Sequence, residues 1–259
     1  MTFINALEEN FFACGRYWGS LNSSLNSTQT IYSMNSGIMS ADLNWVWNER
    51  PLTLDNAGAI AQIKNSYKQL ALPFWWWVYP SGQSLLTKTM LEGAGLHRET
   101  AIPCLAADLS RLPVDAALPA AINISLVEKD RDLACWEEIS CAGFAMEAAS
   151  QTQYHNFISS FDMSGASPQK LFLAFFAGKP VATALLFFYK ETAGLYFVST
   201  LPAYRRRGIG LSLTRATMHY AQRAGSKFII LQSSAAGLRV YQQAGFKEYC
   251  RADIYTIRL

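Results

Sequence analysis

The chain has 259 residues, 51% of them apolar, which is enough for one large domain or two smaller ones. A formal net charge of +3 at pH 7 lacks the concentrated basic character of a nucleic-acid-binding protein, so we expect no nucleic-acid partner. Five cysteines without a CxxC pair argue against a disulfide framework or a zinc site, and they favour a cytoplasmic protein without metal. No apolar run reaches the roughly 18 residues of a membrane span, and we expect no membrane association.

The first half of the sequence predicts helices and strands in turn. Apolar residues at helical spacing predict helices over 1–20 and 55–70, with a polar loop over 21–30 between them and the following strands. A further helix over 84–94 is expected to end at Gly95. Apolar and aromatic runs predict strands over 31–34, 43–47 and 73–80, and one strand or a pair of strands over 97–109. The proline-flanked segment 112–120 is the expected linker.

The second half shows the same kinds of pattern. The expected strands are 122–127, 171–176, 181–189, 195–200 and 227–232, with a last strand that contains the alternating residues 254 and 257. The expected helices are 130–141, 151–161, 209–225 and 235–244. Strands and helices are therefore mixed along the whole chain, which indicates an α/β (α+β) protein.

The most informative stretch runs from Gly194 to Gly210 and has the sequence GLYFVSTLPAYRRRGIG. It predicts a buried strand, a turn with three arginines, and a helix that begins at Ile209. A helix N-terminus leaves N–H groups unpaired and carries partial positive charge, and glycines at 208 and 210 let a phosphate approach those groups. The stretch therefore predicts a diphosphate-binding loop. It lacks the GxGxxG motif of a Rossmann fold and the GKS or GKT of a P-loop.

The two halves of the chain share a weak internal repeat. The segment LEGAGLHRET (91–100) aligns with YQQAGFKEYC (241–250): in both, a helix ends at Ala-Gly and a strand follows after an apolar residue. An apolar strand precedes each copy. A helix that ends at glycine before a strand is also common in unrelated proteins. The order of strand, helix, Ala-Gly turn and strand that both copies share nevertheless predicts two domains of one fold, 1–115 and 121–259.

The motifs of the second half resemble those of the GNAT superfamily of N-acetyltransferases. Arg205, Gly208 and Gly210 fit the pattern [QR]xxGx[GA] of the acyl-CoA pyrophosphate loop, and VYQQAGF (240–246) fits the helix that bears a tyrosine before Gly-Phe. The resemblance covers residues 121–259. It implies two GNAT-like domains, each a mixed, mostly antiparallel twisted sheet flanked by helices, of which the first is a diverged copy without the pyrophosphate loop.

The resemblance implies that acetyl-CoA is the acyl donor. The residues it assigns to the cofactor are Val198 and Thr200 on the strand, Arg205, Arg206, Arg207, Gly208, Ile209 and Gly210 in the loop, and Ser234, which stands where many relatives carry Asn. The strand is expected to diverge from its neighbour so that its backbone pairs with the pantetheine arm. Nothing in the first half matches RRRGIG, and Leu91 aligns with Tyr241, so one active site per chain is expected.

The catalytic residues are less well defined. Tyr241 is the expected general acid, because a phenol with a pKa of about 10 stays protonated beside a thiol with a pKa of about 8.5. The strand 195–201 contains no Asp or Glu, which leaves Glu147 and Glu191 as alternatives for the base, and each is also a typical surface charge.

Two functions are compatible with the sequence. The first is an N-acetyltransferase in which a primary amine of a small molecule or protein attacks directly in a ternary complex. The alternative is a catalytically impaired acyl-CoA sensor or partner-binding module. The amine is not identified by the sequence, and a homodimer is compatible with either function.

Overall fold

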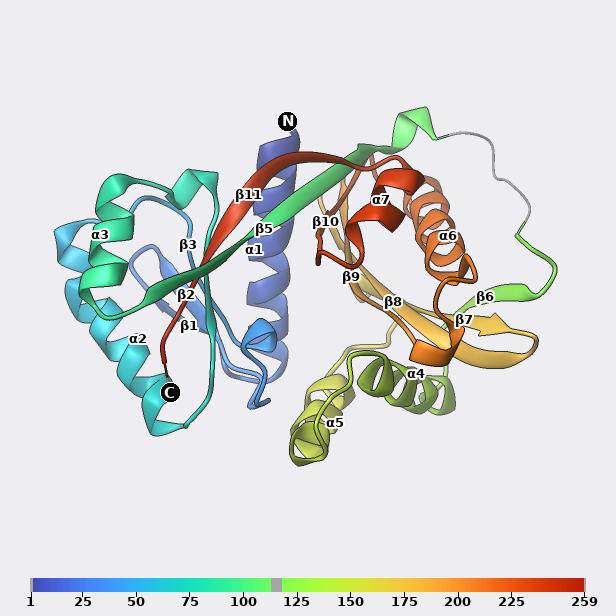
Figure 1. Cartoon of the computed structure of the whole chain (residues 1–259), viewed down its shortest axis with the longest axis horizontal. Coiled ribbons are helices and arrows are strands. Elements are labelled where there is room, and N and C mark those ends of the chain that lie inside the picture. The colour runs from blue at the N-terminus through green and yellow to red at the C-terminus, as the bar shows by residue number, and fades with distance from the viewer. Residues whose placement is uncertain (1, 113–117, 259) are drawn as a thin grey trace. The chain divides into compact units, whose positions relative to one another are not determined.

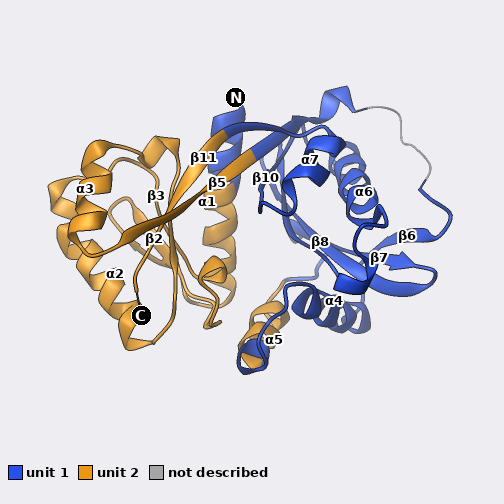
Figure 2. Cartoon of the chain, in the orientation of Figure 1, with its two compact units in different colours: residues 1–10, 105–151, 162–249 blue, residues 11–104, 152–161, 250–259 orange. Residues whose placement is uncertain are grey.

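The computed structural model describes residues 2–112 and 118–258, and the chain forms two compact units (Figure 2). Unit 1 comprises residues 1–10, 105–151 and 162–249, and unit 2 comprises residues 11–104, 152–161 and 250–259. The units therefore differ from the continuous halves expected from the sequence, because both ends of the chain contribute to both units. Whether 1–115 and 121–259 are two copies of one domain stays a prediction.

Unit 1 is a mixed sheet with helices on both sides (Figure 1). Its strands are β6 (Ile122–Leu126), β7 (Gln169–Phe176), β8 (Lys179–Tyr189), β9 (Thr192–Thr200) and β10 (Phe228–Gln232), with the end of β5 (His97–Asp108) next to β10. Neighbouring strands from β6 to β9 are antiparallel, whereas β10 runs parallel to β9. The helices are α4 (Asp130–Gly143), α6 (Ile209–Arg223) and α7 (Leu238–Ala244).

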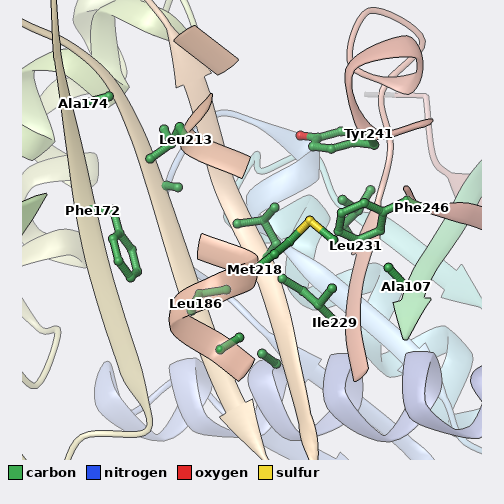
Figure 3. Packing of buried hydrophobic residues seen from close by; sticks show 14 of the residues in the cluster. Ala107, Phe172, Ala174, Leu186, Leu213, Met218, Ile229, Leu231, Tyr241 and Phe246 are labelled. Carbon is green, nitrogen blue, oxygen red and sulfur yellow. The ribbon is translucent and has the colours of Figure 1, made fainter. Parts of the chain in front are cut away.

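The core of unit 1 lies between the sheet and the helices α6 and α7 (Figure 3). Alternate residues of the strands, such as Leu186, Leu195 and Leu231, face Leu213 and Met218 of α6, and all five are at most 3% exposed. The strands β7 to β10 were predicted from their continuous apolar runs, and most of their residues are buried on both faces of the sheet. The cluster holds the first turns of α6 in place behind the predicted diphosphate loop.

Unit 2 has the same kinds of element. Its strands are β1 (Asn26–Thr28), β2 (Ile31–Met34), β3 (Trp45–Asn48), β4 (Trp75–Val78), β11 (Lys247–Thr256) and most of β5, and its helices are most of α1 (Phe3–Leu21) and α5 (Gln151–Ser159), with α2 (Ala57–Gln69) and α3 (Leu85–Gly93). The strand order is β1-β2-β3-β4-β11-β5, with β3 and β4 parallel. Both units are thus mixed, mostly antiparallel sheets, which confirms the expected fold class.

The turn of the internal repeat has the same geometry in both copies. Gly95 and Gly245 are left-handed, with φ of +85° and +103°. The N–H of the next residue, Leu96 or Phe246, donates to the carbonyl of residue 91 or 241 at 3.0 Å in each copy. Each turn therefore closes a helix with the hydrogen bonds of a glycine C-cap.

Two expectations differ from the structure, and a third falls partly outside the described residues. The polar loop expected over 21–30 contains the short, exposed strand β1, which pairs with β2. Helix α7 begins at Leu238 instead of residue 235, because the N–H of Gly237 donates to the Ser234 side chain in a preceding turn. Residues 113–117 of the expected linker lie outside the described residues.

Candidate functional site

The site is built where β9 and β10 part. These parallel strands pair through only three residues each, from Thr192 with Phe228 to Gly194 with Ile230. Both strands continue beyond the last pair, β9 to Thr200 and β10 to Gln232. The facing backbone edges are therefore unpaired over the ends of both strands, which confirms the divergence expected from the sequence. We call this opening the fork.

A β-bulge in β9 accompanies the fork. Phe197 and Val198 together oppose one residue of β8, and Phe197 adopts a left-handed φ of +50°. The buried hydroxyl of Thr183 donates to the Phe197 carbonyl at 3.0 Å and lies 2.8 Å from the Ser199 hydroxyl. A bulge re-aims the backbone of its strand. It thereby leaves Val198, one of the residues predicted to bind the cofactor, without a register partner on β8 or β10.

The loop between β9 and α6 presents unpaired N–H groups. Ser212 is the first residue of this helix region whose backbone N–H has a carbonyl partner, at 2.9 Å from Gly208 O. Within the described part of the chain, no acceptor faces the backbone N–H groups of residues 206–211. Arg206 and Gly208 are left-handed, with φ of +63° and +77°, and such residues fold successive N–H groups into an anion-binding concavity.

The two glycines of this loop have different roles. Gly208 is the N-cap of α6, and its positive φ would strain any other residue. Gly210 has an ordinary backbone, and a Cβ placed on it would come no closer than 3.9 Å to the Thr200 hydroxyl and 4.0 Å to Val240. The space over Gly210 is therefore open, as a loop that binds a diphosphate requires.

The three arginines are held in different ways. The Arg205 guanidinium donates to the carbonyls of Thr200 and Gly143 at 3.0 Å each, so it connects the loop with the end of α4. The Arg207 guanidinium lies 5.4 Å from the Phe176 ring and 5.5 Å from the Tyr204 ring, in cation–π geometry. Arg206 is exposed. Arg206 and Arg207 are therefore better placed than Arg205 to meet an anion.

Tyr241 lies at the edge of the unit 1 core. Its side chain is 9% exposed, and burial raises its pKa to about 12. The ring packs edge-on against Phe246, and the hydroxyl oxygen is at the end of the ring away from Phe246 (Figure 3). A Cβ on Gly237 would come within 2.8 Å of the ring, so glycine is needed there to seat it. The Ser234 hydroxyl is 3.2 Å from Gly237 N and thus supports the same turn.

The two carboxylates considered as bases are not equally placed. Glu147 is exposed in the segment between α4 and α5. Glu191 pairs with Lys227 at 2.5 Å, and its carbonyl accepts the N–H of that lysine. It precedes β9, so the length of that strand separates it from Thr200 at the fork. Glu191 is therefore unsuitable as the base, and Glu147 stays a prediction.

In unit 2, the corresponding place between the parallel strands β3 and β4 is filled. The Asn48 carboxamide donates to the Gly82 carbonyl at 3.2 Å and accepts from the Trp76 indole at 2.9 Å. The turn before α2 is closed by a capping box between Thr53 and Asn56. In the described part of unit 2, Asn48 thus occupies the place that corresponds to the fork, and a capping box closes the turn before α2. The expectation of one site per chain stays a prediction.

Sequence reasoning missed two residues of the fork. Thr183, which holds the bulge, lies in an apolar run whose pattern indicates only a strand. Gln232 ends β10, and its buried carboxamide nitrogen has no hydrogen-bond partner among the described residues. Its position directly after the run FIIL is the one signal that could have drawn attention to it.

Other kinds of site have less support. Among residues 2–112 and 118–258, no three His, Cys, Asp or Glu side chains form a group that could hold a metal ion. None of the described helices has the length and hydropathy needed to cross a bilayer. A cavity of about 300 Å³ in unit 1 is lined by residues such as Met218, Gly245 and Tyr249, and none of the predicted cofactor residues lines it.

Comparison with known proteins identifies the class. The sequence model of the acetyltransferase (GNAT) family matches residues 133–246, which span the bulge, the loop and Tyr241. This segment is a GNAT acetyltransferase family domain. No curated protein sequence matches the chain.

Solved structures share the fold over nearly the whole chain. A GCN5-related N-acetyltransferase from Kribbella flavida is 18% identical, with a TM-score of 0.72 and coverage of 96% of this chain and 95% of that one. One from Sphaerobacter thermophilus is 16% identical, with a TM-score of 0.64 and coverage of 88% and 76%. A tandem GNAT protein from the clavulanic acid biosynthesis pathway is 14% identical, with a TM-score of 0.59 and coverage of 87% and 77%. The two-unit arrangement is consistent with this tandem protein.

The raised pKa of Tyr241 predicts a pH-dependent loss of stability. Above pH 10 the exposed tyrosine of the unfolded chain ionises, whereas the buried one resists ionisation up to about pH 12. The stabilisation that Tyr241 contributes is thus complete below pH 10 and falls as the pH rises to 12, by up to about 2–3 kcal/mol. Urea unfolding of wild type and Tyr241→Phe at pH 9, 10 and 11 measures this. A difference between the two proteins that is independent of pH would contradict it.

Proposed function

We propose that the chain is an acetyl-CoA-dependent N-acetyltransferase that transfers the acetyl group to a primary amine by direct attack in a ternary complex. The observation that supports this most strongly is the run of unpaired N–H groups over residues 206–211 beside the open fork. Together they offer donors for a diphosphate and strand edges for an amide-rich arm. Acetyl-CoA supplies both of these groups and a thioester for the amine to attack.

In this proposal, the loop 206–211 and the strands at the fork bind and orient acetyl-CoA. The N–H groups of residues 206–211 bind the diphosphate, with added attraction from the α6 dipole of roughly half a positive charge. Arg206 and Arg207 add charge-assisted contacts of about 1.5–3 kcal/mol each. Val198 and Thr200 pair through their backbone with the pantetheine arm. Ser234 acts through the turn that it supports, and Ile209 contributes its N–H.

Tyr241 is the proposed general acid. A phenol is protonated at neutral pH, so Tyr241 can donate to the leaving thiolate as the amide forms. Burial raises its pKa to about 12, which keeps it protonated and makes it a weaker acid. The amine must lose a proton before or during its attack. We retain Glu147 as the proposed base, acting through water because its side chain is exposed.

A second function has one observation in its favour. Strand β9 carries no Asp or Glu that could act as the base. Glu147, the remaining candidate for the base, has an exposed side chain. An acyl-CoA sensor would keep the fork and the loop without the base. Binding of acetyl-CoA with no release of CoA thiol over a broad panel of amines would favour the sensor.

We further propose a cytoplasmic protein without metal or nucleic-acid partner, and a homodimer stays an open alternative.

The space over Gly210 provides the first test. We expect Gly210→Trp to weaken acetyl-CoA binding at least 100-fold, because the indole fills the place of the diphosphate and removes several charge-assisted hydrogen bonds. Titration calorimetry measures it. Gly165→Trp is the matched control, since nothing lies within 4 Å of a Cβ there and its φ is not positive. Equal affinity of the Gly210→Trp variant and wild type would contradict the proposed loop.

Tyr241 provides the second test. We expect Tyr241→Phe to bind acetyl-CoA as wild type does and to release CoA thiol roughly 10²–10⁴-fold more slowly, because a positioned general acid contributes about that factor. A thiol assay over amino acids, polyamines, amino sugars and lysine peptides measures turnover. Tyr220→Phe, a half-buried tyrosine of α6, is the control. Unchanged turnover of Tyr241→Phe would remove this residue from the mechanism.

A further inference from the structure

Phe197, in the bulge of β9, has a backbone conformation that its side chain disfavours. Its φ of +50° is left-handed, a region that bulky side chains rarely adopt because the Cβ atom comes too close to the following carbonyl oxygen. Residues in such conformations persist only where the surrounding structure fixes them, and they cluster at functional sites. The contacts that fix this bulge are therefore candidates for residues that position the site.

Two buried hydroxyl groups hold the bulge. The Thr183 hydroxyl gives its proton to the Phe197 carbonyl at 3.0 Å, so in its contact of 2.8 Å with the Ser199 hydroxyl it accepts. The two hydrogen bonds therefore tie both neighbours of Val198 to one side chain of β8. Thr183 is fully buried and Ser199 is 6% exposed, so little water competes for these bonds.

The residue between these two bonds turns its backbone toward the fork. The N–H of Leu201 donates to a carbonyl of β8 at 2.9 Å, and Ser199, two residues earlier, is in register with Thr183, so both turn their backbone groups toward β8. Successive residues of a strand turn these groups to opposite sides. Val198 and Thr200 therefore turn theirs away from β8, to the side on which β10 has stopped pairing.

Gly143, the last residue of α4, packs directly against Ser199. A Cβ atom placed on this glycine would overlap the Ser199 hydroxyl and lie 2.8 Å from the Ser199 Cβ atom and 3.7 Å from the Thr200 backbone nitrogen. The Arg205 guanidinium reinforces the contact by donating to the carbonyls of Gly143 and Thr200 at 3.0 Å each. A side chain at position 143 would therefore displace Ser199 and disturb its hydrogen bond to Thr183.

We propose that Thr183 and Gly143 are positioning residues for the acyl donor, because they hold the open edge of β9 in the orientation that pairs with the pantetheine arm. Neither residue touches the donor. Thr183 acts through its hydrogen bonds to the bulge, and Gly143 acts by leaving room for Ser199. The proposal rests on the proposed function, since it concerns the arm of acetyl-CoA. It adds that affinity for the arm is set by β8 and α4, separately from the loop that binds the diphosphate.

Two ligands separate this role from that of the loop. Acetyl-CoA carries both the arm and the diphosphate, whereas adenosine 3′-phosphate 5′-diphosphate is the nucleotide portion of CoA without the arm. We expect Thr183→Val to weaken binding of acetyl-CoA on the order of 10-fold or more, because about two backbone hydrogen bonds to the arm are lost. The same variant is expected to bind the nucleotide as wild type does. Titration calorimetry with both ligands measures this. Thr183→Ser keeps the hydroxyl and is expected to bind acetyl-CoA as wild type does.

Gly143→Ala tests the same edge from α4. Alanine normally favours a helix over glycine, but here its methyl group displaces Ser199, so we expect weaker binding of acetyl-CoA and unchanged binding of the nucleotide. Gly93→Ala is the matched control, because Gly93 is the last residue of α3 and no described residue comes within 4 Å of a Cβ placed there. Thr217→Val is the control for Thr183→Val, because Thr217 is fully buried and its hydroxyl donates to a carbonyl of α6 at 2.8 Å. Both controls are expected to bind both ligands as wild type does.

Other outcomes would overturn the proposal. If wild type, Thr183→Val and Gly143→Ala bind acetyl-CoA equally well, the two residues do not position the arm, and the proposed function stands. An equal loss of affinity for acetyl-CoA and for the nucleotide would show that the residues only support unit 1 as a whole. A wild-type chain that does not bind acetyl-CoA would contradict the proposed function itself. If Thr183→Val folds poorly, Gly143→Ala decides the question, because it leaves both hydroxyl groups in the chain.

Discussion

The structure of the site depends on the early end of one strand pairing. β9 and β10 stop pairing after Gly194 and Ile230, and the bulge at Phe197 turns the rest of β9 away. Thr183 fixes this bulge from the neighbouring strand by donating to the Phe197 carbonyl. A sheet that gives up backbone pairing must recover hydrogen bonds elsewhere, and an open edge with exposed donors and acceptors is suited to an extended, amide-rich ligand.

The loop after β9 also has backbone groups without a partner in the protein, which are open to a ligand. The N–H groups of residues 206–211 have no acceptor among the described residues, so an anion can accept from them, and the core beneath α6 holds them in position without a ligand. In unit 2, the corresponding polar groups are bonded within the protein. Asn48 occupies the place between the parallel strands β3 and β4, and a capping box closes the turn before α2. The two units thus differ at this place, which is open in unit 1 and occupied by Asn48 in unit 2, and in our proposal the open one binds the acyl donor.

Much of the fold could be predicted from the sequence. Continuous apolar runs indicated β7 to β10, and glycines 95 and 245 marked helix ends in both copies. The pairing of distant segments could not be predicted, because no local pattern indicates that residues 250–259 belong with residues 11–104. In the site, the glycines of the loop were evident from their spacing. The use of Arg205 as a link to the Gly143 carbonyl was not, because it depends on where α4 ends in space.

The most direct test of the account is a crystal structure of the wild-type chain with CoA. The account predicts the diphosphate oxygens within about 3.2 Å of backbone nitrogens of residues 206–211, and the pantetheine arm between β9 and β10. A diphosphate bound away from this loop, or an arm lying between β3 and β4 of unit 2, would contradict it.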